Sequence, residues 1–395
     1  MTLHTLASLR APNNSLAPHY ARFQVSQRLL LSGHSHQAWP DVAAAAQDEA
    51  FDDAAALLGD KWERAFAKAD RVRAGFRNLL DDPNGHITLI GSTHDAVVRF
   101  LSALPLRERP RIVTTDSEFH TLRRQLDRLQ EEGIAILRVP AAPAETLAER
   151  LALALSDDTA AVMISSVSFL SSEIVPHLGG LQIACDKLGA ALFIDTYHHL
   201  NVAPFSIARD GLQRAYVTGG GYKYCQLGEG NCFLRFPQDS TLRPLVTGWY
   251  AEFDLLSGEH ADTLTQYPNG PGRFAGATYD PVSHYRAAAV FDFFAAQGLD
   301  IALLREVSQH QIARLREGFD ALPRTTLTRD NVRLDATAGF LALRSPQATA
   351  LAAQLHARGV DCDARGEVLR LGPAPYLSDA QLDRAIAILG EVTRG

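Results

Sequence analysis

One lysine in this sequence stands in an unusual setting. Lysine occurs four times among 395 residues, against 34 arginines, and Lys223 lies in the glycine-rich stretch VTGGGYKYCQLGEGN (217–231). A lysine in a cleft can lose its proton through desolvation and then attack a carbonyl group, whereas an arginine stays protonated. The alternative is a surface lysine in a flexible loop, and the scarcity of lysine elsewhere argues against it.

An acid, a histidine and an aromatic ring follow other apolar runs. Asp195 comes directly after ALFI (191–194), and His198 stands three residues later. Phe119 follows the run RIVTTD, and Ser168 follows VMISSV. An acid at the end of a buried strand is costly without a cation nearby, so Asp195 is predicted to pair with a positive group. The alternative is an acid that caps the following turn.

Small hydroxyl residues follow a further apolar run. Ser92 and Thr93 come after GHITLI (85–90) and a glycine, at the start of a predicted helix. Backbone N–H groups at a helix start suit a phosphate, although Ser92 could equally cap the helix without a ligand. A phosphate cradle, an aromatic plate, an acid and a nucleophilic lysine together fit pyridoxal 5′-phosphate (PLP), which needs a Schiff-base lysine and an acid at its pyridine nitrogen.

The segments that position these residues alternate between strands and helices. Strands are predicted at 85–90, 111–116, 134–139, 160–169, 191–195, 214–219 and 231–237, with helices at 121–133, 146–155 and 179–190 between them. Near-continuous apolar strands separated by helices indicate a mostly parallel sheet that is covered on both faces. Ligands bind beyond the carboxyl ends of the strands in such sheets, where the residues above are expected to meet.

The last third of the chain has a different pattern. Long helices are predicted over 282–322, followed by short strands, a helix at 347–358 and a last helix at 378–392. We predict an N-terminal arm (1–50) that packs with the small domain, a large PLP-binding α/β domain (51–280) and a small α+β C-terminal domain (281–395).

Composition excludes several classes of protein. The net charge of −7, without runs of like charge, gives no reason to expect nucleic acid or an anionic membrane as a partner. The N-terminus does not read as a signal peptide, and no apolar run approaches the ~20 residues of a membrane helix, so a cytoplasmic enzyme is expected. Four cysteines without a CxxC pair, and histidines without HExxH spacing, predict no metal site.

The ordered motifs resemble the class V aminotransferase group of fold-type I PLP-dependent enzymes, and within it kynureninase, over about residues 28 to 392. The resemblance implies a mostly parallel seven-stranded sheet with helices on both faces and a smaller α+β C-terminal domain. The match of the segment IDTYHHLNVAP implies that Asp195 binds the pyridine nitrogen and that His198 lies near the phenolic oxygen. The match of GGGYKYCQLGEG implies that Lys223 forms the Schiff base and that Tyr222 reaches the phosphate.

Four further motifs carry roles by the same resemblance. SEFH makes Phe119 the ring that stacks on the cofactor, and RPLVTGWY places Trp249 beside the cofactor or substrate. RFAGAT implies that Thr278 reaches the phosphate of a partner subunit, which requires a homodimer. VLRLGPAPY implies that Arg370 holds the α-carboxylate of an amino acid, for which a planar guanidinium is suited.

Three segments depart from kynureninase. SGHSHQAWP (32–40) stands where Gly-Asn-Ser-Leu-Gly is usual, Leu-Gly-Glu-Gly (227–230) replaces Gly-Gly-Pro-Gly, and VSFLSSE (167–173) lacks a glycine. The changes lie on the substrate side and make His34 and Ser35 candidates for substrate binding. The roles of His34, His36, His94 and His199 stay open, because each could be a structural histidine.

The resemblance implies kynureninase-like hydrolytic Cβ–Cγ cleavage, which would turn kynurenine or a related substrate into alanine and an aromatic acid. The alternative is a class V aminotransferase, or another PLP-dependent β-lyase on a different amino acid, because these share every cofactor residue. A cysteine desulfurase would need a nucleophilic cysteine, for which Cys362 is the candidate. A non-catalytic scaffold is the remaining alternative, and the joint presence of Lys223, Asp195 and Arg370 argues against it.

Overall fold

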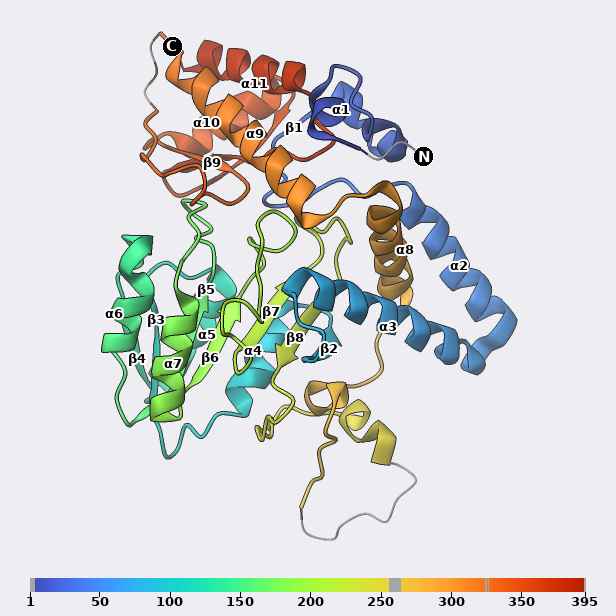
Figure 1. Ribbon diagram of the computed structural model, residues 1–395, viewed down its shortest axis with the longest axis vertical. Helices are drawn as coiled ribbons and strands as arrows, with labels where there is room; N and C mark the ends of the chain where they lie inside the picture. Colours follow the sequence, from blue (N-terminus) through green and yellow to red (C-terminus); the bar gives the residue numbers. More distant parts are fainter. Residues whose placement is uncertain (1–3, 256–263, 324, 326, 394–395) are drawn as a thin grey trace.

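The central feature of the fold is a seven-stranded sheet, shown in Figure 1 in a computed structural model that describes residues 4–255, 264–323, 325 and 327–393. The strand order is β2-β8-β7-β6-β5-β3-β4. β8 runs antiparallel to both of its neighbours, and the pairs from β7 to β4 are parallel. The strands are β2 His86–Ile90, β3 Arg111–Thr115, β4 Ala135–Val139, β5 Thr159–Ser165, β6 Ala191–Asp195, β7 Tyr216–Gly220 and β8 Cys232–Phe236. The prediction of a mostly parallel sheet is confirmed.

Both faces of this sheet are covered. In β6, Leu192 and Ile194 belong to one buried cluster and Phe193 belongs to another. Successive side chains of a strand point to opposite faces, so each face of the sheet carries its own core. The helices predicted in the first 190 residues are present as α4 Thr93–Ser102, α5 His120–Glu131, α6 Leu147–Leu153 and α7 Leu178–Leu188. Three further helices, α1 Leu6–Arg10, α2 Val42–Leu57 and α3 Lys61–Leu80, were not predicted.

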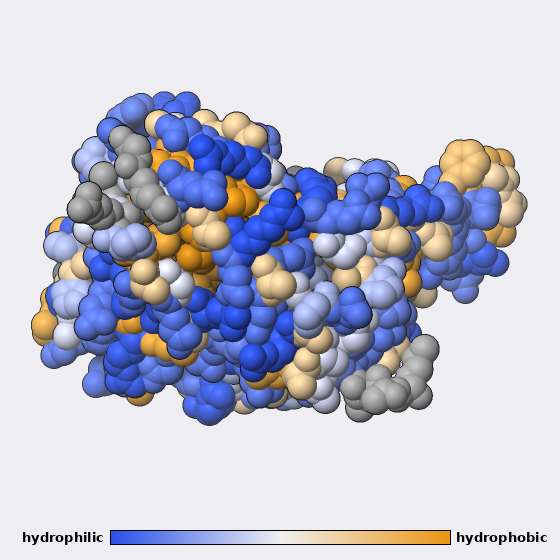
Figure 2. All heavy atoms as spheres, turned by 90° about the horizontal axis from the view of Figure 1, so that it is seen from above, coloured by the Kyte–Doolittle hydropathy of each residue, from blue (hydrophilic) through white to orange (hydrophobic). Residues whose placement is uncertain are grey.

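The helices α2 and α3 form a protrusion at one side of the molecule, distinct from the predicted N-terminal arm (Figures 1 and 2). α8 (Val282–Gln297) packs against both of them. The end of this protrusion is coloured as apolar in Figure 2, and Phe51 and Leu58 are 74% and 76% exposed. The predicted boundary at residue 50 falls inside α2, and the boundaries at 50 and 280 stay predictions.

The C-terminal part joins helices to a small antiparallel sheet in the order β11-β12-β9. Its elements are α9 Ile301–Asp320, β9 Leu341–Arg344, α10 Ala348–Ala357, β10 Val360–Asp361, β11 Asp363–Arg365, β12 Val368–Leu371 and α11 Asp379–Val392. The N-terminal segment reaches it through β1 (Leu29–Leu30), which pairs with β10 in parallel. Among the described residues, no single helix has the length and apolar character to cross a membrane, and α8 with α9 passes that test only as a pair bent by 84°.

Candidate active site

Lys223 lies three residues beyond the end of β7 and is only 5% exposed. Its Nζ lies 2.9 Å from Nε2 of His198, a residue of the turn that follows β6. Three aromatic rings surround the amine, with centroids 4.5 Å away for Tyr197, 5.3 Å for Phe119 and 5.8 Å for Tyr222. The predicted lysine, histidine and aromatic plate therefore meet beyond the carboxyl ends of the parallel strands.

Glycine makes this close packing possible. A Cβ atom on Gly220, the last residue of β7, would lie 2.4 Å from the ring of Tyr197. Gly228 adopts a φ of +69°, a left-handed conformation that other residues rarely adopt, and a Cβ atom there would lie 2.7 Å from the ring of Trp39. The glycine-rich sequence on either side of Lys223 is thus required by steric contacts.

Burial changes the charge of these groups. It lowers the pKa of Lys223 to about 7, an effect that nearby Asp195 opposes and Arg370 reinforces. Burial, with the positive charges of Lys223 and Arg370, also holds the pKa of His198 well below its usual value. Much of the lysine is therefore a neutral, nucleophilic amine near pH 7, beside a neutral imidazole.

Asp195 ends β6 and carries an acid into the same region. Its Oδ1 accepts a hydrogen bond of 2.8 Å from the backbone N–H of Tyr197, and it forms no ion pair with any residue that the structure describes. Burial raises its pKa, while that hydrogen bond and the charge of Lys223 act in the opposite direction. A carboxylate in this state fits a cationic ring nitrogen, which PLP would bring.

The predicted phosphate cradle lies at the start of α4. The Ser92 hydroxyl caps the helix by accepting a hydrogen bond of 3.2 Å from the backbone N–H of Asp95, and Thr93 is the first helical residue. The capping function that the sequence left open is therefore present. The remaining N–H groups of the first turn fit a phosphate. Lys223, Asp195 and this helix start thus fit the three parts of PLP.

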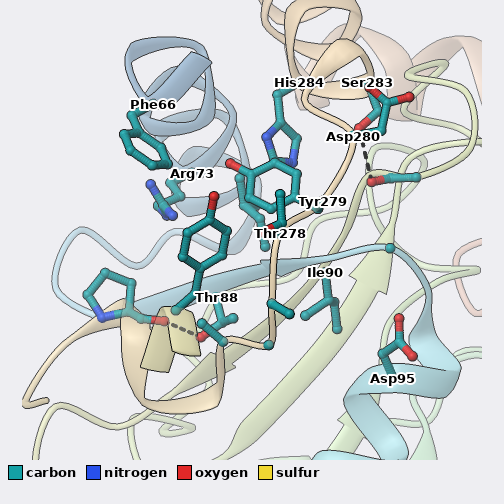
Figure 3. Close-up of a pocket in the computed structure, with 18 of the residues that line it drawn as sticks. Phe66, Arg73, Thr88, Ile90, Asp95, Thr278, Tyr279, Asp280, Ser283 and His284 are labelled. Atoms are coloured by element: carbon teal, nitrogen blue, oxygen red, sulfur yellow. Dashed lines mark hydrogen bonds between the residues drawn. The ribbon is translucent and has the colours of Figure 1, made fainter. Parts of the chain in front are cut away.

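Trp249 and Thr278 lie elsewhere within the single chain. The indole N–H of Trp249, which is 44% exposed, donates to Thr278 Oγ1 at 3.2 Å. Thr278 lines a cavity of about 870 Å³, shown in Figure 3 with Thr88, Asp95 and His284. Lys223, His198 and Asp195 do not line this cavity. Thr278 and Lys223 therefore do not share this cavity, and the role of Thr278 stays a prediction for a partner subunit.

Arg370 and His34 meet in a buried cluster around an acid. Arg370 lies in β12 directly opposite Asp363 of β11 and forms two hydrogen bonds with it, Nε to Oδ1 at 2.8 Å and a terminal nitrogen to Oδ2 at 2.5 Å. The His34 ring, which is fully buried, bonds the same Oδ1 through Nε2 at 2.8 Å. His34 therefore contacts Asp363, the acid that pairs with Arg370, and its own ring is not exposed to a ligand.

The other candidates on the substrate side make local contacts. The Ser35 hydroxyl lies 3.1 Å from Nδ1 of His36, whose ring stacks on Tyr222 with centroids 4.9 Å apart. The Ser168 hydroxyl accepts hydrogen bonds from the two backbone N–H groups of residues 170 and 171 in the turn after β5. The substrate and cofactor roles of Ser35 and Ser168 stay predictions.

Two of the open histidines have clear surroundings. Both ring nitrogens of the buried His199 have partners, the Ser166 hydroxyl and the Pro204 carbonyl, each at 3.1 Å. His199 is therefore a structural histidine. His94 lies on the exposed side of the first turn of α4.

Sequence reasoning did not single out three residues of the site. Tyr197 supplies the ring nearest to the lysine, and Asp363 holds Arg370. Glu118 is buried between the hydroxyls of Thr115 and Ser165, and burial raises its pKa to about 7. The signal for Asp363 was available, since a hairpin centred on Gly366 places residues 363 and 370 opposite each other.

We compared the sequence and the structure of the chain with those of known proteins. No protein-family model matches the chain. An uncharacterised aminotransferase of Bacillus subtilis, YcbU, is 21% identical over 347 residues, which are 87% of this chain and 89% of that protein. Three solved structures superpose over nearly the whole chain at low identity. A mutant of C-DES with glycine covalently linked to its PLP cofactor has a TM-score of 0.81 at 15% identity, covering 95% of this chain and 98% of that one.

Cysteine desulfurase CsdA of Escherichia coli has a TM-score of 0.78 at 14% identity and covers 99% of both chains. A cysteine desulfurase from Thermococcus onnurineus NA1 has a TM-score of 0.77 at 15% identity, covering 93% of this chain and 95% of that one. The predicted architecture is thereby confirmed. The chain has the α/β fold of the fold-type I PLP-dependent enzymes, in the form found in cysteine desulfurase structures.

Proposed function

We propose that this protein is a PLP-dependent enzyme that acts on an amino acid, either as a class V aminotransferase or as a β-lyase on the same cofactor. The observation that carries the proposal is the buried, partly neutral amine of Lys223, held 2.9 Å from His198 among aromatic rings and beside Asp195. The relative YcbU, named an aminotransferase, and the structure of C-DES with its product cysteine persulfide, described as a cystine C–S lyase, support these two activities.

The residues of the site divide the work between them. When bound, PLP withdraws electrons from the α-carbon of an amino acid. Lys223 would hold the cofactor and, once free, take the α-proton at Nζ. Asp195 would face the pyridine nitrogen, and Phe119 would stack on the ring. Arg370 would bind the α-carboxylate, and the start of α4 would bind the phosphate.

Kynureninase-like hydrolysis is a narrower form of the same proposal. The histidine at position 198, where glutamine is usual in desulfurases and many aminotransferases, favours it. The named relatives favour the aminotransferase and the C–S lyase instead. Incubation of the PLP-loaded protein with L-cystine, with L-kynurenine, and with amino acids plus a keto acid separates the three. No turnover in any arm, despite a cofactor bound at Lys223, would contradict an enzymatic function for these substrates.

Cys362 provides a direct test of the desulfurase alternative. It lies between β10 and β11, and burial raises the pKa of its thiol to about 12, so a thiolate is scarce near neutral pH. Cys362→Ala is expected to change kcat by less than about twofold, because no reactive thiolate is removed. A large loss of sulfur transfer from cysteine in this variant would instead support the hypothesis of a cysteine desulfurase.

The lowered pKa of Lys223 predicts how cofactor attachment depends on pH. Only the neutral amine attacks the PLP aldehyde, and the neutral fraction rises as the pH passes upward through about 7. The attachment rate to the apoprotein, followed by visible absorbance, should therefore increase about tenfold between pH 6 and pH 7.5 and then level off. A rate that keeps rising up to pH 10 would show an ordinary lysine.

We further propose a homodimer in which Thr278 reaches the cofactor of the partner subunit. The cavity lined by Thr278, and the exposed side chains of Leu245 (85%), Trp249 (44%) and Phe253 (43%) in the neighbouring segment, support a partner at this face. A holoenzyme with the mass of a single chain in solution would contradict this assembly. A small-molecule amino acid remains the proposed substrate, and the cytoplasm remains the proposed location.

A further inference from the structure

The substrate end of the site contains an acid whose presence there needs an explanation. Asp363 forms two hydrogen bonds with Arg370 and one with His34. We propose that Asp363 sets how strongly the site prefers a carboxylate over a neutral group, by cancelling the charge of Arg370 while leaving two of its N–H groups for the substrate carboxylate. This inference rests on the proposed function, in which Arg370 receives that carboxylate.

The hydrogen bonds of the buried Arg370 leave some of its donors unused. A guanidinium has five N–H donors. Asp363 takes one from Nε and one from a terminal nitrogen, and the Phe169 carbonyl takes one from the other terminal nitrogen at 2.7 Å. Two N–H groups, one on each terminal nitrogen, remain without a partner among the residues that the structure describes. Both are donors suited to a carboxylate, and Asp363 takes neither of them.

The charges of the cluster sum to zero. Burial opposes ionisation of Asp363, but the hydrogen bonds from His34 and Arg370 prevail and hold its pKa below the usual range. Burial lowers the pKa of His34 to about 4, so its imidazole is neutral near pH 7. One negative and one positive charge therefore face each other. Arg365, which is 40% exposed, lies 3.4 Å from Asp363 on the solvent side, where water screens it.

The acid is not the sole support of the arginine. Arg370 also bonds the Phe169 carbonyl and lies 5.6 Å from the centroid of the Phe340 ring. Its position should therefore survive replacement of Asp363 by asparagine, which keeps one acceptor oxygen.

The replacement of Asp363 by asparagine removes the repulsion between the Asp363 carboxylate and a ligand carboxylate. Two unit charges about 6 Å apart change binding by roughly a hundredfold at an effective dielectric constant of about 20, so at least about tenfold is expected after screening.

The experiment measures the part of the binding affinity that comes from the carboxylate. The PLP-loaded protein is titrated with L-alanine and with L-alaninamide, which replaces the carboxylate by a neutral amide, and the visible absorbance of the cofactor reports binding. The ratio of the dissociation constants, amide over acid, should be below about tenfold in the wild type. Asp363→Asn should raise this ratio at least about tenfold. Asp361→Asn, an acid of the adjacent β10 that pairs with Arg28, should leave the ratio unchanged.

Each outcome has a separate meaning. Arg370→Gln should lower the ratio below the wild-type value, and an unchanged ratio would overturn the substrate side of the proposed function. A lower ratio in Arg370→Gln without a rise in Asp363→Asn would overturn only the present inference. If Asp363→Asn does not fold, a wild-type ratio above about tenfold overturns the inference by itself. No spectral change with either ligand in the wild type would overturn the proposed function and this inference together.

Discussion

Lys223→Ala is expected to reduce turnover by at least about a thousandfold and to abolish the stable visible absorbance of the bound cofactor. The reason is that the amine 2.9 Å from His198 would both hold PLP and move the α-proton. Lys223→Arg should be equally inactive, because a guanidinium cannot deprotonate and attack the cofactor aldehyde. Absorbance spectra and single-turnover assays with the substrate identified by the three-arm incubation measure both effects.

Lys187→Ala is the matched control, because Lys187 lies exposed in the last turn of α7. This variant should keep the wild-type spectrum and rate. The loss in Lys223→Ala should also occur without loss of folding, since alanine at 223 removes a buried amine and leaves the aromatic cluster intact. Full turnover by Lys223→Ala would remove the central role of this lysine.

Asp195→Asn is expected to lower kcat by roughly a hundredfold to a thousandfold with a smaller effect on KM. An asparagine fills the same space at the end of β6 and can accept the hydrogen bond from the N–H of Tyr197, but it carries no charge to hold a protonated ring nitrogen. The loss should therefore fall on the chemical step. Steady-state kinetics and cofactor titration separate it from weaker PLP binding.

The exposed Asp157, before β5, offers a control of the same type. Asp157→Asn should change neither kcat nor the spectrum. An Asp195→Asn enzyme with normal kcat would mean that the acid caps the turn after β6 and does not act on the cofactor. That capping alternative was the one left open by the sequence.

Strands were predictable where burial is continuous. β6 and β8 correspond closely to the predicted segments, because strands that are buried on both faces read as nearly continuous apolar runs. The predicted strand at 160–169 ends early, at Ser165, since the Ser168 hydroxyl accepts backbone N–H groups and turns the chain. β1 was not predicted, because its two residues pair with β10, some 330 positions later.

The position of Lys223 in a glycine-rich turn was predictable from local composition, but only some of the contacts around it were. Lys223, His198 and Phe119 come together as expected because each follows a strand that ends at the same edge of the sheet. The burial of His34 could not be predicted, because it depends on contact with Phe340 and Gly372, distant in sequence. The ion pair of Arg370 with Asp363 was predictable in principle, because the hairpin turn at residues 366 and 367 places the two side chains opposite each other.

The N-terminal segment has a mechanical consequence for the two halves of the site. The N–H of Gly33 bonds the carbonyl of Gly372, next to the strand of Arg370, and the N–H of Gln37 bonds the carbonyl of Tyr222, next to Lys223. The five residues 33–37 thus tether the arginine proposed to bind the carboxylate to the lysine proposed to hold the cofactor. Any separation of these two groups must be absorbed within that short span, so the tether limits how far the site can open. Residues 33–37 would thereby limit the distance between the group that binds the carboxylate and the cofactor, and so the size of the substrate that fits between them.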